Sequence, residues 1–138
     1  MAGMLLIPIA LLLYINGTVK KLKEERCGVE CGGEIVPGLL FADDTCLMAS
    51  DAAGLKKSLD VLVKWCKEWG VKINVAKSGV MHIHNKKVER CKMTYEVDGE
   101  AIPMVSSYKY LGCVVDEHLV LTEMVEERAE AGRRALGA

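Results

Sequence analysis

Two adjacent carboxylates, Asp43 and Asp44, lie between two apolar runs and are the strongest candidates for functional residues in this sequence. Anionic side chains repel each other, so holding them together is costly unless water, a base or a cation compensates. The chemistry that such a pair favours is the binding of a divalent metal ion through carboxylate oxygens. An Asp doublet also suits a solvated turn, so the pair by itself leaves both interpretations open.

The apolar runs on either side must position this pair. Residues 38–42 and 45–49 carry no charge, and each run is about as long as a buried strand. Because Asp is a favoured turn residue, the simplest geometry is a tight hairpin with Asp43 and Asp44 at its tip.

A helix is predicted directly after this hairpin. Ser50 or Asp51 can cap a helix over residues 52–69, and Gly70 can end it. The apolar residues that recur at helical spacing are Leu55, Leu59, Leu62, Val63, Cys66 and Trp69.

The rest of the chain mixes helical and strand patterns. His82 and His84 share one face of a predicted strand, and without a third ligand we expect exposed histidines that do not bind metal. The expected elements are a helix over 5–25, a loop or short hairpin over 27–38, strands over 71–75 and 80–84 around a turn at 76–79, a hairpin at Asp98-Gly99, an extended segment over 108–115 and a helix from Thr122.

The composition is that of one globular domain or a piece of a larger one, with 138 residues of which 51% are hydrophobic and 27% charged. A net charge of -1 provides no general attraction to nucleic acid, so any such binding depends on local basic clusters. These clusters are Lys20, Lys21, Lys23 and Arg26; Lys56 and Lys57; and Lys86, Lys87, Arg90 and Lys92.

An apolar run over residues 4–15 is too short to span a membrane, since a helix of that length covers about 18 Å of a hydrocarbon core of roughly 30 Å. Pro8 interrupts the run, and the pattern of a secretory signal is incomplete. The six cysteines lie largely in apolar contexts that favour reduced thiols. We therefore expect an intracellular protein, nuclear or cytoplasmic, without membrane association or secretion.

Three patches occur in an order that resembles the later palm motifs of reverse transcriptases of the non-LTR (LINE-type) retrotransposon and group II intron kind. The similarity extends over roughly residues 5–136, and residues 12–16 resemble the helix after the family's motif B. The three patches are Phe41-Ala42-Asp43-Asp44, like motif C; Ile73-Asn74-Val75-Ala76-Lys77-Ser78-Gly79-Val80-Met81, like motif D; and Tyr108-Lys109-Tyr110-Leu111-Gly112, like the primer grip.

The resemblance implies an α+β fold. Residues 1–118 would form a partial polymerase palm, in which an antiparallel sheet bearing the Asp-Asp hairpin packs against two helices. Residues 119–138 would begin the thumb with a truncated helix. The implied activity is that of an RNA-directed DNA polymerase, acting on an RNA template, a DNA primer and dNTPs.

The resemblance also assigns roles to single residues. Asp43 would be a direct Mg²⁺ ligand and Asp44 a supporting carboxylate, in a site that holds two Mg²⁺ ions in the complete enzyme. Lys77 would lie near the triphosphate as a third catalytic residue. The primer terminus would be held by Tyr108, Lys109, Tyr110, Leu111 and Gly112.

The family's motif A aspartate is not found, since no carboxylate precedes Glu24 in this sequence. We therefore expect weak Mg²⁺ binding and no polymerisation by this polypeptide alone. An alternative function is that of a non-enzymatic remnant that binds RNA or a protein partner through its basic patches. A further alternative, a small secreted or membrane-anchored protein, requires oxidised cysteines and glycosylation at Asn16.

Overall fold

The computed structural model describes residues 15–85, 92–120 and 122–137. The chain divides into two compact units, Met1–Ile73 and Asn74–Ala138. The start of the expected N-terminal helix, with Pro8, lies outside the described residues, as do Lys86, Lys87, Arg90 and Cys91.

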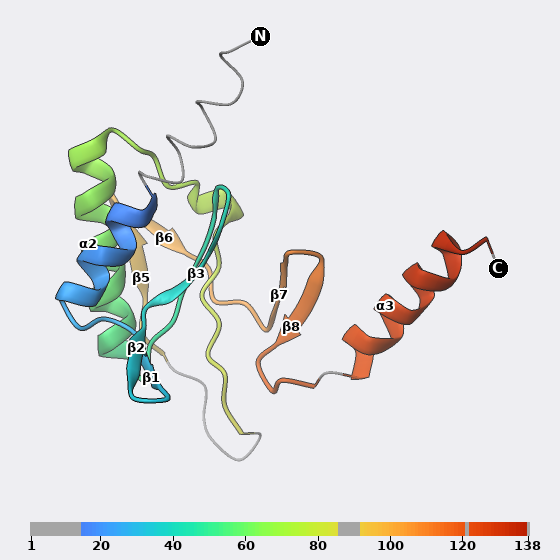
Figure 1. Ribbon diagram of the computed structural model, residues 1–138. Helices are drawn as coiled ribbons and strands as arrows, with labels where there is room; N and C mark the ends of the chain where they lie inside the picture. Colours follow the sequence, from blue (N-terminus) through green and yellow to red (C-terminus); the bar gives the residue numbers. More distant parts are fainter. Residues whose placement is uncertain (1–14, 86–91, 121, 138) are drawn as a thin grey trace, which may run out of the picture. The chain divides into compact units, whose positions relative to one another are not determined.

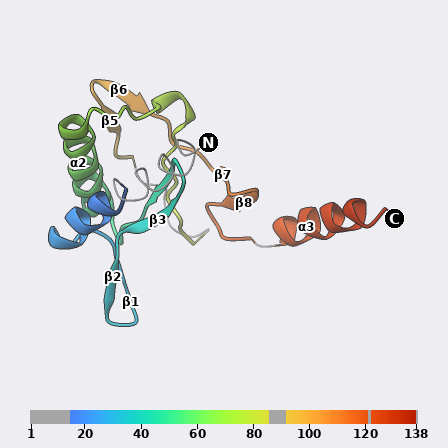
Figure 2. The ribbon, with the colours of Figure 1, turned by 45° about the horizontal axis from the view of Figure 1, so that its top comes forward.

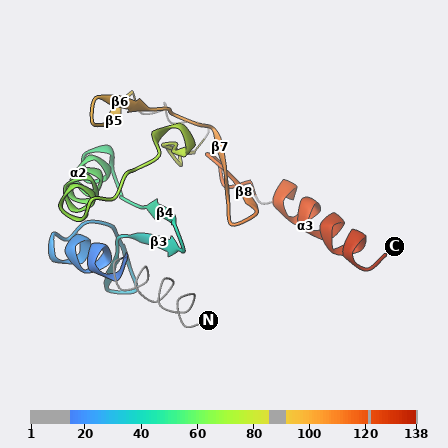
Figure 3. The same ribbon diagram turned by 90° about the horizontal axis from the view of Figure 1, so that it is seen from above.

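Two helices lie side by side in the first unit. One covers residues 15–24 of the described chain, and the other is α2 (Ala52–Trp69), as Figures 1 and 3 show. The Lys57 side chain of α2 donates a hydrogen bond to the Glu25 carbonyl, just after the first helix. Leu22 of the first helix and Leu59 and Trp65 of α2 are buried. The two helices pack together at Gly17, where an added Cβ would lie 3.6 Å from the Trp65 Nε1 atom.

The predicted helix over residues 52–69 is confirmed by α2. It could be predicted because residues adjacent in sequence set both of its ends. The Asp51 carboxylate accepts a hydrogen bond of 2.7 Å from the Gly54 N–H, which otherwise has no partner within the helix. Gly70 ends the helix in the left-handed conformation with φ 67°, which glycine adopts without a steric cost. The buried Ser58 hydroxyl donates to the Gly54 carbonyl, which satisfies it.

The described strands form four separate antiparallel hairpins, each with a two-residue loop. β1 (Val29–Cys31) pairs with β2 (Glu34–Val36), and β3 (Gly38–Phe41) pairs with β4 (Asp44–Leu47). β5 (Tyr95–Val97) pairs with β6 (Glu100–Ile102), and β7 (Ser107–Tyr110) pairs with β8 (Cys113–Asp116). The architecture is therefore α+β, but the described strands do not join into the single sheet that the sequence led us to expect.

Backbone conformation explains why the loops are tight. Gly32-Gly33, Asp98-Gly99 and Leu111-Gly112 all have positive φ at both positions, the geometry that matches the twist of antiparallel strands. The predicted Asp98-Gly99 hairpin is confirmed. Residues 108–115 were expected to be one extended segment, and this was wrong, because the chain reverses at Leu111-Gly112.

The strands predicted over residues 71–75 and 80–84 are also wrong. Residues 71–74 lack strand structure, and the 3₁₀ helix η1 (Val75–Lys77) follows them. The Asn74 carboxamide accepts a hydrogen bond of 3.2 Å from the Lys77 N–H, and this local bond favours a turn over a strand. Residues 80–84 form only one isolated parallel bridge, between Val80 and Met104.

The second unit continues through the β7–β8 hairpin into α3 (Thr122–Ala135), as Figure 2 shows. Arg128 of α3 donates hydrogen bonds of 3.1 Å to the Leu111 carbonyl and to the Cys113 Sγ atom. This side chain therefore joins the helix to the turn between β7 and β8.

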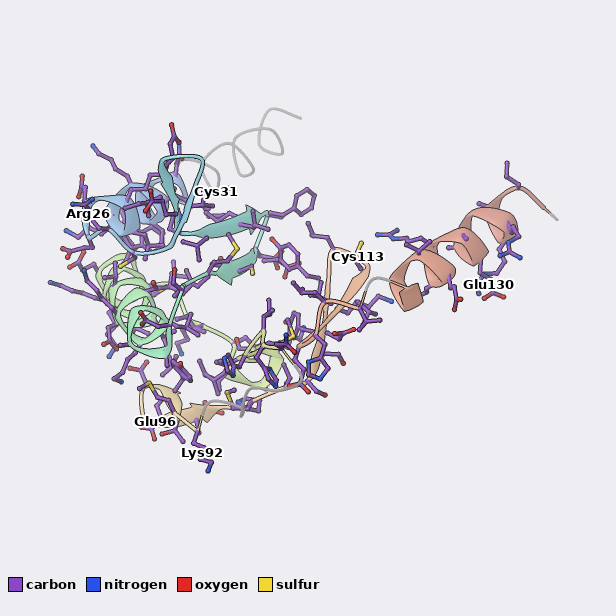
Figure 4. The ribbon with its side chains drawn as sticks, turned by 90° about the horizontal axis from the view of Figure 1, so that it is seen from below. Arg26, Cys31, Lys92, Glu96, Cys113 and Glu130 are labelled. Atoms are coloured by element: carbon purple, nitrogen blue, oxygen red, sulfur yellow. The ribbon has the colours of Figure 1, made fainter. Side chains whose placement is uncertain are left out.

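The cysteines of the described residues are free thiols: Cys27, Cys31, Cys46, Cys66 and Cys113. Cys31 belongs to the β1–β2 hairpin and Cys113 to the β7–β8 hairpin (Figure 4). Of the helices that the structure describes, none is both long and apolar enough to cross a membrane.

The Asp116 carboxylate at the end of β8 caps the following turn. It accepts hydrogen bonds from the backbone N–H of Val120 at 3.2 Å and of His118 at 2.7 Å. These bonds hold the pKa of Asp116 below its ordinary value, and the bond from Val120 has the largest effect.

Replacing Gly38 with Ala is expected to destabilise the β3–β4 hairpin, because the added Cβ would collide with the Cys46 carbonyl oxygen. We expect a loss of about 1–3 kcal/mol in the free energy of unfolding, measured by urea denaturation. Gly132→Ala is the matched control, since nothing described lies within 4 Å of its added Cβ. Equal stability of Gly38→Ala and the wild type would contradict the backbone approach described above.

Asp116→Asn is expected to lower the free energy of unfolding at neutral pH. The difference in this free energy between the variant and the wild type should become smaller in acid. A carboxyl whose pKa is lowered in the folded state contributes stability above its unfolded pKa of about 4, and that contribution is lost as the pH falls through the folded pKa. Urea denaturation across this pH range measures the difference. Glu100→Gln, which removes an exposed carboxylate from β6, controls for the lost charge. A difference that stays constant with pH would rule out this role for Asp116.

Candidate active site

The Asp pair lies on the β3–β4 hairpin. Phe41 pairs with Asp44, so Ala42 and Asp43 form the two-residue loop and Asp44 is the first residue of β4. The predicted hairpin is confirmed, but its turn lies one residue earlier than expected. Ala42 has φ 51°, a conformation that costs an L-residue about 1–2 kcal/mol.

Both carboxylates are exposed. Among the described residues, no hydrogen-bond donor or cation pairs with either Asp43 or Asp44. Water can therefore offset their mutual repulsion, and their oxygens are available to a cation from solution.

The inner face of the hairpin anchors the pair to the first unit. Leu40 and Leu47 line a small apolar cavity with Val19 and Leu22 of the helix over residues 15–24. At about 10 Å³ the cavity has no room for a ligand, so its lining side chains serve packing. β4 also contacts α2, which places one end of the hairpin against both helices.

The outer face carries Asp44 together with exposed apolar side chains. Leu39 and Phe41 share this face with Asp44 and Cys46, because residues alternate along a strand. Leu39 is 50% exposed and Phe41 61% exposed. Burial raises the pKa of the Cys46 thiol, so at neutral pH Cys46 is a protonated apolar neighbour.

The chemistry of Asp43 and Asp44 fits a hard divalent ion, but the pair supplies only part of a ligand set. Two adjacent carboxylates offer the oxygen ligands that Mg²⁺ prefers. Within the described part of the chain, no group of three His, Cys, Asp or Glu side chains is arranged to hold a metal ion.

Lys77 and Tyr108 lie in the second unit, and the structure joins them. Lys77 is the last residue of η1 and is exposed. The Tyr108 hydroxyl donates a hydrogen bond of 2.7 Å to the Lys77 carbonyl. The two residues belong to separate sequence patches, and no spacing pattern reveals a contact between positions 31 residues apart.

The five predicted primer-binding residues divide between a strand and a turn. Tyr108, Lys109 and Tyr110 lie in β7, whereas Leu111 and Gly112 form the loop before β8.

Two residues of α3 that no sequence motif assigned to the site contact these segments. Arg128 binds the Leu111 carbonyl, and Glu127 forms an ion pair of 3.7 Å with Lys109. The hydrogen bond to Cys113 raises the pKa of Arg128. Only the folded hairpin brings the helix residues close to the loop.

The histidines differ from the prediction in their exposure. His82 and His84 are half-buried, with stacked rings whose centroids are 4.8 Å apart, and His118 packs against His84 at 5.0 Å. The backbone N–H of His84 donates a hydrogen bond to the Glu117 carbonyl, which joins residues 82–84 to the chain around His118. A pattern within residues 80–84 could not predict this partner.

Comparison with known proteins agrees with the resemblance found in the motifs. The family model "Reverse transcriptase (RNA-dependent DNA polymerase)" matches residues 2–115. A relative in Drosophila melanogaster, "Probable RNA-directed DNA polymerase from transposon BS", is 32% identical over 85 residues, which are 57% of this chain and 9% of that protein. "RNA-directed DNA polymerase from mobile element jockey", also from Drosophila melanogaster, is 27% identical over 99 residues, which are 67% of this chain and 11% of that protein.

No solved structure gives a significant match to the chain. The matched regions span about a tenth of the length of these two relatives, at 9% and 11%. The family model, in contrast, covers most of this sequence, from residue 2 to residue 115. The chain therefore belongs to the reverse transcriptase family.

Proposed function

We propose that this chain is a portion of an RNA-directed DNA polymerase of a LINE-type retrotransposon. In this proposal residues 1–118 belong to the palm and residues 119–138 begin the thumb. The family match and the two transposon relatives support the polymerase activity. The RNA template, the DNA primer and the dNTPs are the proposed partners, in a nuclear or cytoplasmic setting.

The observation that carries the proposal is the pair of exposed carboxylates on a hairpin whose inner face is anchored by apolar packing. Asp43 lies in the loop and is proposed as the direct metal ligand. Asp44 is paired in β4 and is proposed as the supporting carboxylate. Two Mg²⁺ ions, when bound, would activate the primer 3′-hydroxyl and stabilise the leaving pyrophosphate.

The second unit contributes the proposed contacts to phosphate and primer. Lys77 is exposed at the end of η1, where its ammonium group can pair with the anionic triphosphate. The β7 residues and the Leu111-Gly112 loop are proposed to hold the primer terminus. Arg128 and Glu127 support this hairpin from α3.

The incomplete ligand set has a direct consequence for the isolated chain. Two-metal catalysis needs enough oxygen ligands to hold both ions, and no group of three candidate ligands occurs among the described residues. We propose that another part of the polymerase supplies the remaining carboxylate. The 138-residue chain alone is then expected to bind metal weakly.

Asp43→Asn is expected to weaken divalent metal binding by about tenfold or more, the scale of damage to a metal ligand set. Mn²⁺ is a suitable paramagnetic probe, and its effect is measured as broadening of the amide NMR signals of residues 42–45 in the 138-residue chain. Asp44→Asn should have a smaller effect, and Asp60→Asn on the exposed face of α2 is the control. Equal broadening in the wild type and in Asp43→Asn would refute Asp43 as a ligand.

Primer extension with Mg²⁺, template and dNTPs tests the incomplete site separately. The isolated chain is expected to yield no product, for want of the further carboxylate. Asp43-dependent product from the chain alone would show that its own residues suffice.

A further inference from the structure

The Tyr108 side chain connects the two segments that were assigned to different substrates. Its hydroxyl donates a hydrogen bond of 2.7 Å to the Lys77 carbonyl, although Tyr108 is 39% exposed. A Cβ built on Gly79 would lie 3.4 Å from the Tyr108 ring, so the ring lies against the chain just after Lys77. The phenol therefore contacts this turn through both its hydroxyl and its ring.

The turn that carries Lys77 needs such support. A 3₁₀ helix of three residues has weak internal hydrogen bonds. Asn74 holds it from one side, since its carboxamide accepts from the Lys77 N–H and its carbonyl accepts from the Ser78 hydroxyl at 2.8 Å. From the other side, the Tyr108 hydroxyl of β7 donates its hydrogen bond to the Lys77 carbonyl.

Backbone bonds extend this connection on both sides. The Val80 N–H donates to the Pro103 carbonyl at 2.9 Å, and the Val105 N–H donates to the Val80 carbonyl at 2.8 Å. The chain after η1 is thus bonded to the chain that leads into β7. A displacement of β7 would therefore be transmitted to the Lys77 backbone.

We infer that Tyr108 is a positioning residue for Lys77: its phenol fixes the turn from which the lysine side chain reaches a substrate phosphate. The inference rests on the proposed function of Lys77, and it deepens that proposal by assigning the Tyr108 hydroxyl to the lysine rather than to the primer. A movement of β7 would then change the position of the Lys77 ammonium group through this hydrogen bond, in addition to the backbone bonds at Val80.

Tyr108→Phe tests the connection, because it removes the hydroxyl and keeps the ring. Amide hydrogen exchange, measured by NMR on the ¹⁵N-labelled 138-residue chain, should accelerate about fivefold at Lys77 and Ser78, the scale of one lost hydrogen bond. Exchange in β5 and β6 should not change. Ser107→Ala, which removes a neighbouring hydroxyl from β7, is the matched control and should leave Lys77 and Ser78 unaffected.

Unchanged exchange at Lys77 and Ser78 would overturn the inference. An equal acceleration in β5 and β6 would also overturn it, because it would show a loss of general stability rather than of local support.

Titration with magnesium tripolyphosphate separates positioning from a purely structural role. The NMR shift of the Ser78 amide should saturate at a several-fold higher tripolyphosphate concentration in Tyr108→Phe than in the wild type and in Ser107→Ala. Lys77→Gln should abolish the response. A normal response in Tyr108→Phe would overturn the inference alone, whereas no response in the wild type would contradict the proposed function of Lys77.

Discussion

The close approach of the β3 and β4 backbones at Gly38 determines where the two candidate metal ligands stand. Gly38 pairs with Leu47, and the Cys46 carbonyl occupies the space that a Cβ would need. This register places Leu40 against the helix over residues 15–24 and leaves Asp44 on the opposite face. A slip of one residue would exchange the two faces, because side chains alternate along a strand.

Support of a different kind holds the candidate phosphate and primer segments. Val75 of η1 is buried and η1 contacts β6, while polar bonds from Tyr108 and Arg128 connect η1 and the β7–β8 hairpin to their neighbours. In the first unit, apolar packing of Leu40 and Leu47 anchors the hairpin whose exposed end bears Asp43 and Asp44. In the second, hydrogen bonds to the Lys77 and Leu111 carbonyls support the segments that carry the proposed phosphate and primer contacts.

Local chemistry explains which elements could be predicted. Helix α2 and the Asp98-Gly99 hairpin depend on residues adjacent in sequence, namely the caps Asp51 and Gly70 and a dipeptide suited to positive φ. The strands expected over 71–75 and 80–84 were wrong because alternation of apolar residues does not provide a pairing partner. The turn at Leu111-Gly112 escaped notice because an apolar residue rarely adopts positive φ.

The sequence by itself determined the family, because the order of the motifs can be read along the chain. It also determined the Asp43-Asp44 pair between apolar runs and the helix that follows, because both depend on residues adjacent in sequence. Only the tertiary structure decided that Asp43 lies in the loop while Asp44 begins a strand, since strand pairing sets the register. The structure alone also joined Tyr108 to Lys77 across 31 residues. Such contacts depend on how the chain returns on itself, which no local pattern encodes.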